Sequence, residues 1–239
     1  LEYLDLSTND LEGAIPAELG QLSNLAFLDL SHNDDLAGVI PGELGQLSNL
    51  THLDLSYAYR LETFPVELGE LTNLVYLNLH ACELGCEVPA ELGNLANLTT
   101  LDLSYNWLTG AIPPELGGLM SLEDLTLYNN YLTSIPSELG QLSNLTQLRM
   151  SANSLNEIGP GSLSGLHSIE LIDLGENYLS QQLVDEIIGQ LHDARFSYTA
   201  AWKTLDLGEC FNQCPSETAR AQIAELESYG WIVLLPGDC

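Results

Sequence analysis

The stretch Leu98–Ser121, LTTLDLSYNWLTGAIPPELGGLMS, decides the fold because most of the chain repeats it with small changes. Its phrase LDLS recurs almost unchanged, and each copy is followed by a version of IPxELGxLxNL. Successive units are 23 to 25 residues long and begin at Leu1, Leu25, Leu50, Leu74, Leu98, Leu122, Leu145 and Ile169. The chain is therefore a tandem array, in which each unit stacks on its neighbours.

Within one unit, apolar and polar residues alternate as they do in a half-buried β-strand. Leu101 and Leu103 point inward, while Thr100 and Asp102 face the opposite, concave side. Asn106 then turns the chain inward, where its amide can bond to the backbone of neighbouring units. A short helical or extended convex segment follows, and the core of the unit is completed by Leu108, Ile112, Leu116 and Leu119.

The signature LxxLxLxxNxLxGxIPxELGxLxxL resembles the plant-type leucine-rich repeat of receptor-kinase ectodomains, polygalacturonase-inhibiting proteins and secreted algal and bacterial proteins. This resemblance covers Leu1 to about Ser168. It implies an α/β solenoid, a right-handed superhelix with a parallel concave β-sheet and short helical or 3-10 convex segments. Ala58 and Cys82 depart from the pattern, because each stands where Asn is expected. We expect these units still to stack, with different local loops.

The repeat pattern decays after Ser168, so we predict seven repeats in residues 1–168 and a degenerate eighth repeat with a C-terminal αβ cap in 169–239. Terminal repeats of a solenoid must be atypical because they cover the last open core. The predicted elements of this segment are a helix over 182–192, a strand over 202–207, a helix from 215 to 228 and a strand over 231–235. No N-terminal cap is visible, which suggests that the chain is part of a longer product.

The charge balance restricts the class of partner. Lys and Arg number 5 against 34 Asp and Glu, which gives a formal net charge of −29. Such a surface repels nucleic acid and anionic lipid headgroups, whereas cationic proteins, metal ions and neutral glycans stay possible. The acidity could also serve solubility alone. No apolar run approaches the roughly 20 residues that a membrane-spanning helix needs.

Five cysteines point to an oxidising compartment, and hence to an extracellular or cell-surface location. Cys82 and Cys86 lie in one short loop, so we predict a disulfide between them. Two of Cys210, Cys214 and Cys239 should form a second bridge in the cap, with the remaining cysteine unpaired. A zinc site is the alternative, but the CxxxC pairs lack the usual CxxC and histidine companions.

Aromatic residues just after the strands are the least consensus-like feature. We expect them to crowd one lateral edge of the concave sheet and to anchor a partner, together with two residues of the strands themselves. The alternative is that each tyrosine packs on its neighbour and does nothing more. The predicted ligand-binding residues are Tyr57, Tyr59, Tyr76, Tyr105, Trp107, Tyr128, Tyr131 and Arg149.

Residues at equivalent positions of successive repeats suggest two further kinds of site. Asp10, Asp34 and Asp35 fall at equivalent loop positions of adjacent repeats and could share a calcium ion; no other cofactor is expected. Three NLT sequons begin at Asn49, Asn97 and Asn144 and could carry N-glycans, although the same tripeptide also follows from the repeat consensus.

Nothing in the sequence indicates an enzyme, because its five histidines have no recurring partner beyond consensus Ser and Asp, and phosphate-loop, nucleophile-elbow and HExxH motifs are absent. Two functions fit. The first is an extracellular recognition module that binds a protein or peptide along the concave face and its Tyr/Trp-rich edge. The alternative is a structural cell-surface or matrix component that self-associates or binds glycans, with calcium linking its acidic surfaces.

Overall fold

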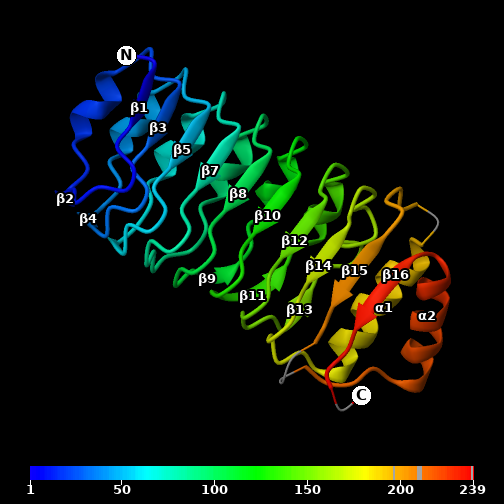
Figure 1. Cartoon of the computed structure of the whole chain (residues 1–239). Helices are drawn as coiled ribbons and strands as arrows, with labels where there is room; N and C mark the ends of the chain where they lie inside the picture. The colour runs from blue at the N-terminus through cyan, green and yellow to red at the C-terminus, as the bar shows by residue number, and fades with distance from the viewer. Residues whose placement is uncertain (196, 209–211, 238) are drawn as a thin grey trace.

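A computed structural model of the chain describes residues 1–195, 197–208, 212–237 and 239, and it is an arc of stacked turns with the two termini at opposite ends (Figure 1). Within this described part, the inner side of the arc is one parallel sheet of ten strands. In spatial order these are β1 (Tyr3–Asp5), β3 (Phe27–Asp29), β5 (His52–Asp54), β7 (Tyr76–Asn78), β8 (Thr100–Asp102), β10 (Asp124–Thr126), β12 (Gln147–Arg149), β14 (Leu171–Asp173), β15 (Lys203–Asp206) and β16 (Trp231–Leu234).

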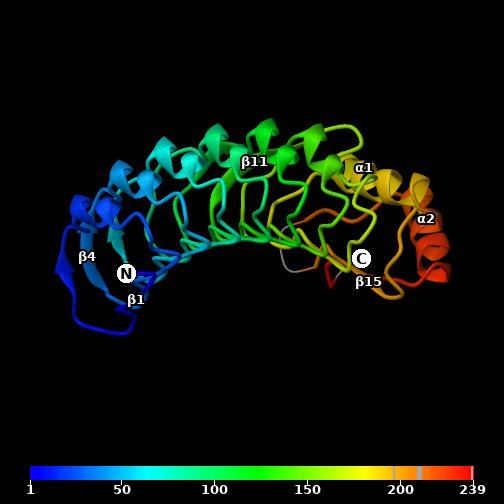
Figure 2. The same cartoon turned by 90° about the horizontal axis from the view of Figure 1, so that it is seen from above.

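The outer side of the arc carries one short 3-10 helix in each of the first six repeats, and Figure 2 shows this layer above the sheet. These helices are η1 (Ala17–Gln21), η2 (Gly42–Gln46), η3 (Val66–Glu70), η4 (Ala90–Asn94), η5 (Pro114–Gly118) and η6 (Ser137–Gln141). Each follows a proline in extended conformation, which supplies the fixed φ needed just before the first helical residue. The solenoid fold predicted from the sequence is confirmed.

Two small parallel sheets run along one lateral flank, among the residues that the structure describes. The first contains β2 (Glu12–Gly13), β4 (Asp35–Gly38) and β6 (Arg60–Leu61), and the second contains β9 (Thr109–Ala111), β11 (Tyr131–Ile135) and β13 (Glu157–Ile158). The repeat that holds Cys82 and Cys86 lies between them and contributes a single bridge, from Glu87 to Thr109. The flank is therefore interrupted at the Cys82 repeat, whereas the Ala58 repeat keeps its flank strand β6 and the main sheet is continuous.

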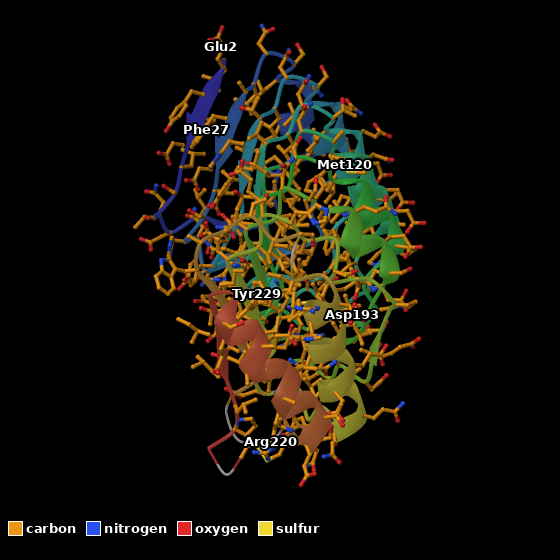
Figure 3. All side chains as sticks on the ribbon, turned by 90° about the vertical axis from the view of Figure 1, so that its right-hand side faces the viewer. Glu2, Phe27, Met120, Asp193, Arg220 and Tyr229 are labelled. Atoms are coloured by element: carbon orange, nitrogen blue, oxygen red, sulfur yellow. A yellow bond between two sulfur atoms is a disulfide. The ribbon has the colours of Figure 1, made fainter. Side chains whose placement is uncertain are left out.

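The C-terminal cap has the αβ composition that the sequence predicts. Helix α1 (Gln181–Asp193) and helix α2 (Glu217–Ser228) lie side by side and close the end of the solenoid (Figure 3). Ser180 and Ser216 cap them, since each side chain accepts a hydrogen bond from a backbone N–H in the first turn. None of the described helices is long and apolar enough to cross a membrane.

The core consists of leucine columns that run along the arc. In the main sheet Leu77, Leu101 and Leu125 are in register, and all three are fully buried. Burial of one such side chain contributes about 1.5 to 3 kcal/mol of transfer free energy. Since every repeat adds the same set, stability accumulates along the array.

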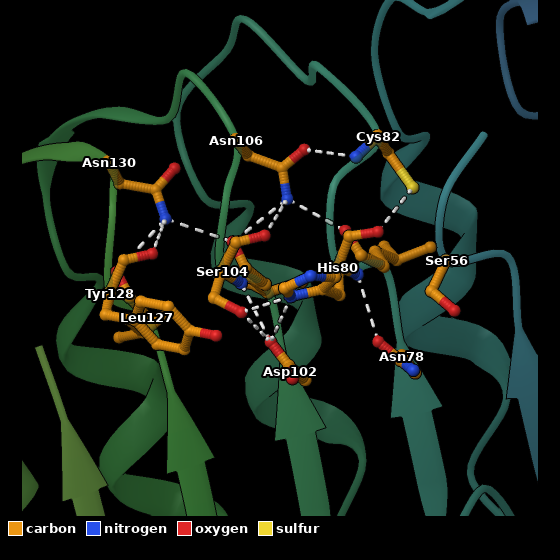
Figure 4. A network of polar contacts seen from close by, with 12 residues as sticks. Ser56, Asn78, His80, Cys82, Asp102, Ser104, Asn106, Leu127, Tyr128 and Asn130 are labelled. Atoms are coloured by element: carbon orange, nitrogen blue, oxygen red, sulfur yellow. Dashed lines mark hydrogen bonds and ion pairs between the residues drawn. The ribbon is translucent and has the colours of Figure 1, made fainter. Parts of the chain in front are cut away.

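A buried ladder of asparagines ties the turns together (Figure 4). Asn106 donates its amide hydrogens to the carbonyls of Leu79, Leu103 and Ser104, and its carbonyl oxygen accepts from the backbone N–H groups of Cys82 and Leu84. This one side chain therefore bonds to five buried backbone groups, of which the carbonyls of Leu103 and Ser104 also accept bonds from Asn130 and Ala81. The ladder also contains Asn33, Asn130, Asn153, Asn177 and Asn212.

The predicted disulfide between Cys82 and Cys86 is wrong, because both are free thiols. Cys82 occupies the ladder position, and its Sγ donates to the carbonyl of Leu55 at 3.1 Å, as an asparagine amide would. Burial raises the pKa of this thiol to about 12, so it stays protonated and keeps its hydrogen. A side chain held inward in this way cannot also reach Cys86 on the flank. The fold, rather than oxidation, accounts for Cys82.

The predicted bridge in the cap is confirmed as Cys214–Cys239, with a Cα–Cα distance of 5.4 Å. It joins the segment before α2 to the chain after β16, and so closes a loop around the last strand and helix of the cap. Cys210, the other candidate, lies outside the described residues.

Replacing Leu103 by Ala should destabilise the protein by about 2 to 5 kcal/mol, because its neighbours in the column cannot collapse into the cavity. Met120 is the matched control, since it is half-exposed on the outer side of the arc (Figure 3). Met120→Ala should cost less than about 1 kcal/mol in the same urea titration. Equal losses from the two changes would contradict the assignment of inner and outer positions.

Replacing Cys82 by Asn should leave the free energy of unfolding unchanged or raise it by up to about 1 kcal/mol, because the amide restores the missing ladder contacts. Cys82→Val, which removes the donor to Leu55, should instead destabilise by about 1 to 3 kcal/mol. Thermal unfolding of the two variants checks this. A large loss in Cys82→Asn would show that the ladder is not what holds Cys82.

Candidate binding surface

The aspartate column of the concave face is largely committed to the fold. The Oδ1 atoms of Asp29, Asp54 and Asp102 each accept a hydrogen bond from the backbone N–H two residues later, at 2.8 to 2.9 Å. Each carboxylate thereby closes the turn at the exit of its own strand. Asp54 also accepts a bond from Asn78 in the next strand. These side chains make the face acidic and hydrated, and they leave few groups for a specific contact.

A stack of four rings covers the N-terminal half of the concave face. Tyr3, Phe27, His52 and Tyr76 follow one another with ring centroids 4.2 to 4.3 Å apart and interplanar angles of 11° or less. The faces of Phe27 and His52 are covered by their neighbours, so a ligand could touch their edges alone. Burial lowers the pKa of His52, which keeps the ring neutral at neutral pH. The sequence shows this column, but the stacking follows from the register of the strands.

Tyr76, on strand β7, is the last ring of this stack and lies apart from the other aromatic residues that the sequence predicts to bind a ligand. Its hydroxyl lies 3.4 Å from Asp54 and accepts a bond from Asn78 at 3.2 Å. Burial and the Asp54 charge raise the pKa of Tyr76 to about 12. It is a packed component of the concave face.

At the exits of the strands, the predicted aromatic edge separates into two parts. The first part is a packed cluster in which rings contact one another across repeats. Tyr57 stacks on His32 at 4.2 Å and meets His80 at 4.9 Å, and Tyr105 meets Tyr128 edge-on at 5.2 Å. His32, Tyr57 and Tyr105 all have positive φ, so the left-handed turn at this position sets the direction of their side chains. Tyr59 contacts Tyr57 edge-on and joins the same cluster.

Within this cluster a serine, a histidine and an aspartate come together without forming a catalytic triad (Figure 4). The Ser104 hydroxyl donates to the Asp102 carboxylate, and Nδ1 of His80 lies 2.7 Å from the hydroxyl oxygen of Ser104. Because the serine hydrogen is used on Asp102, His80 must donate to Ser104. A nucleophilic serine needs the opposite direction, with its proton directed at the imidazole. The arrangement holds the turn and does not activate a hydroxyl.

The second part of the edge consists of open rings. Trp107 and Tyr131 are 52% and 57% exposed, and neither ring contacts another aromatic ring in the described part of the chain. They border a hollow of about 350 Å³, which is also lined by Tyr105 of the packed cluster and by Glu176 and Tyr178. Tyr178 is not among the binding residues predicted from the sequence, although its position in the repeat could have indicated it. It directly follows ladder residue Asn177, as Trp107 and Tyr131 follow their own ladder asparagines.

The two exposed arginines differ in their surroundings. Arg149 lies on the concave strand β12 and bonds through its guanidinium to Gln147, at 2.6 and 3.1 Å. Arg60 is on the flank and pairs with Asp35 at 3.1 Å. Lys203, Arg195 and Arg220 are held within the cap by carbonyl or carboxylate groups. Every cationic side chain of the chain therefore already has an acceptor.

The predicted calcium site is not formed. The described residues contain no group of three or more His, Cys, Asp or Glu side chains that could hold a metal ion. Asp35, which was to share the ion with Asp10 and Asp34, is instead the ion-pair partner of Arg60. The repeat phase places the three residues in adjacent turns, but that does not make their carboxylates converge.

The three sequon asparagines have a structural role in the folded chain. Asn49, Asn97 and Asn144 are exposed, and each donates its side-chain amide to a carbonyl of the preceding repeat at 2.7 to 2.8 Å. Asn73, which begins no sequon, makes the same bond to Ser48. The fold therefore explains these asparagines, and glycosylation of the three sequons stays a prediction.

The division of the edge can be tested by stability alone. Tyr57→Ala should destabilise the protein by about 2 to 3 kcal/mol, since it removes a stacked ring and its burial. Trp107→Ala, which removes an open ring, should cost less than about 1 kcal/mol. Urea titrations followed by circular dichroism compare the two. A larger loss for Trp107 would place that ring in the packed cluster.

Comparisons with known proteins agree with this architecture. Family models described as leucine-rich repeats match residues 1–22, 73–95, 96–141 and 121–179. No curated protein sequence matches the chain significantly. A leucine-rich-repeat protein of Leptospira interrogans has a similar solved structure, with 35% identity and a TM-score of 0.76, over 97% of this chain and 54% of that chain.

Two plant receptor structures are also similar. The ectodomain of the Arabidopsis thaliana membrane receptor kinase GASSHO1/SCHENGEN3, in complex with CASPARIAN STRIP INTEGRITY FACTOR 2, has 30% identity and a TM-score of 0.80, over 98% of this chain and 27% of that chain. The Arabidopsis receptor kinase HAESA, in complex with the peptide hormone IDA and the co-receptor SERK1, has 30% identity and a TM-score of 0.69, over 86% and 35%. This chain thus spans between about a quarter and a half of these three proteins.

Proposed function

We propose that this chain, which is a leucine-rich-repeat protein resembling plant receptor ectodomains, is an extracellular recognition module that binds a peptide or protein partner. The partner lies along the concave face and is anchored at the lateral edge by the open rings of Trp107 and Tyr131. The module binds without chemical conversion of its partner.

The observation that carries this proposal is the contrast between the two kinds of ring at the edge. Tyr57, Tyr105 and Tyr128 each pack against other rings, and Tyr105 also borders the hollow. Trp107 and Tyr131 are half-exposed, border the same hollow and contact no other ring in the described part of the chain. Large aromatic side chains held on a rigid scaffold are the residues that most often dominate binding free energy at interfaces. Stacked repeats provide that rigidity, because each ring is fixed to a turn that the neighbouring turns hold in place.

The comparisons support a peptide or a protein as the class of partner. The solved GASSHO1/SCHENGEN3 and HAESA structures contain a peptide hormone or a factor as ligand, and both are receptor ectodomains or receptor kinases. An extracellular location is also supported by the Cys214–Cys239 bridge, because disulfides persist in oxidising compartments. The alternative is a structural component that self-associates or binds glycans, and for its calcium-linked form the described residues offer no candidate ion site.

The proposal is tested by selecting a random peptide library on the immobilised chain and measuring the affinity of the selected peptides in solution. Trp107→Ala combined with Tyr131→Ala should weaken binding by more than about 2 kcal/mol, the usual loss at an interface hot spot. The melting temperature should change little, so the comparison can be made at equal folded fraction.

Glu18 in η1 and Glu43 in η2 provide the matched control, since both are exposed on the convex side. Glu18→Ala combined with Glu43→Ala should leave the affinity unchanged. A library that yields no binder would refute the proposed function, and peptides that bind the aromatic double variant as well as the parent would refute the anchor.

A further inference from the structure

The main sheet ends in a strand that has one unpaired edge. β16 is the last strand in the spatial order and pairs with β15 alone (Figure 1). The carbonyls of Gly230 and Leu234 accept hydrogen bonds from the β15 side of the sheet, so the even-numbered residues of this segment direct their backbone groups at β15. Because these groups alternate along a strand, the N–H and C=O of Val233 point the other way. Neither group has a hydrogen-bond partner in the described part of the chain.

This edge has none of the features that usually prevent strand pairing. Natural proteins blunt an edge strand with charged side chains, proline or a bulge. β16 has the sequence Trp-Ile-Val-Leu, which has high β propensity, and its register with β15 is regular. On the concave side it presents Ile232 and Leu234, whose side chains are 48% and 45% exposed. The strand is therefore an apolar edge that a further strand can extend.

Electrostatic repulsion keeps a second copy of the chain away from most of this surface, but less so from this edge. The chain has a net charge of −29, yet β16 has no charged residue. The register places one charge of each sign beside it on β15, at Lys203 and Asp206. The concave carboxylates of β14 and earlier strands lie at least two strand spacings, or about 10 Å, from the edge. At physiological ionic strength the Debye length is about 8 Å, so much of their repulsion is screened.

The edge is also complementary to itself. In an antiparallel pair about a twofold axis, Val233 lies opposite Val233 of the copy, and the two residues exchange both of their N–H···O=C bonds. The same register sets Ile232 of each copy opposite Leu234 of the other. Such pairs bring side chains close together, so both exposed side chains are covered at once. A register shifted by one residue would set Val233 opposite a residue whose backbone groups already face β15.

We propose that two copies of this chain associate through the open edge of β16, which joins their main sheets at an antiparallel junction. Twofold dimers are the commonest oligomers, and they use the same patch of both subunits, as this edge requires. Trp107 and Tyr131 lie in earlier repeats and stay outside the junction. The dimer therefore presents two copies of the proposed binding surface, and its formation does not depend on that surface.

The test combines the mass of the protein in solution with amide hydrogen exchange. Sedimentation equilibrium over a range of protein concentrations should show a monomer–dimer equilibrium that strengthens as salt is added, because salt screens the remaining like charges. The amide of Val233 should exchange at least about tenfold more slowly in the dimer than in dilute monomer. The amide of Ile232, which is directed at β15, should be protected in both.

Two kinds of variant connect the mass to the strand. Val233→Pro removes the outward N–H and no bond inside the sheet, so it should fold and weaken dimerisation at least about tenfold. Ile232→Lys combined with Leu234→Lys should also give a monomer, because it places charges on the edge. The matched control is Val39→Lys combined with Val66→Lys, which makes the same charge change at exposed valines of the second and third repeats and should leave the dimer intact.

The outcomes each decide the question. A monomer at every protein and salt concentration, or a dimer that survives both the proline and the double lysine variant of β16, would overturn the proposal. Species larger than a dimer would indicate head-to-tail pairing of β16 with β1, which would overturn it as well. Slow exchange of Val233 in a monomer that has bound a selected peptide would assign the edge to the peptide instead. Failure of the dimer leaves the proposed function untouched, since peptide binding is measured separately at Trp107 and Tyr131.

Discussion

The in-register stacking of parallel strands is the constraint on which the rest of this structure depends. Backbone hydrogen bonds fix successive repeats one strand spacing apart, so residue n of one repeat always lies beside residue n of the next. Convex helices obey the same spacing, and a side chain at Gly93 would collide with the backbone of Glu115 in the following turn. Each column therefore has to be occupied by residues that tolerate a copy of themselves at close range.

That constraint explains why so many polar groups are unavailable for binding. Asparagines at the turn satisfy buried backbone groups, aspartates on the concave face close the strand exits, and exposed asparagines before the main strands join repeat to repeat. The same residue types would suggest ligand sites if they stood alone. In a stacked array they are the means by which the backbone is satisfied at every turn.

A hollow that could accept part of a partner then forms where side-chain size changes along a column. On the concave strands, aromatic residues that continue through adjacent repeats pack on one another, as the Tyr3–Phe27–His52–Tyr76 stack does. Where the column changes from large to small and back, as at Tyr131, Ser154 and Tyr178, a hollow opens. The surface around it is acidic, because each cationic side chain of the protein is already held by an acceptor elsewhere.

The sequence by itself determined the repeat unit, the buried leucine columns, the asparagine ladder and the order of helices and strands in the cap. These features follow from local periodicity, and periodicity is preserved when the repeats stack. Tertiary structure alone decided which aromatic rings meet, that Cys82 points inward to Leu55, and that Asp35 pairs with Arg60. Position in a column gives the neighbour of a residue but not the direction of its side chain. That direction depends on left-handed turns and on space left by the adjacent repeat, and neither can be read from one unit.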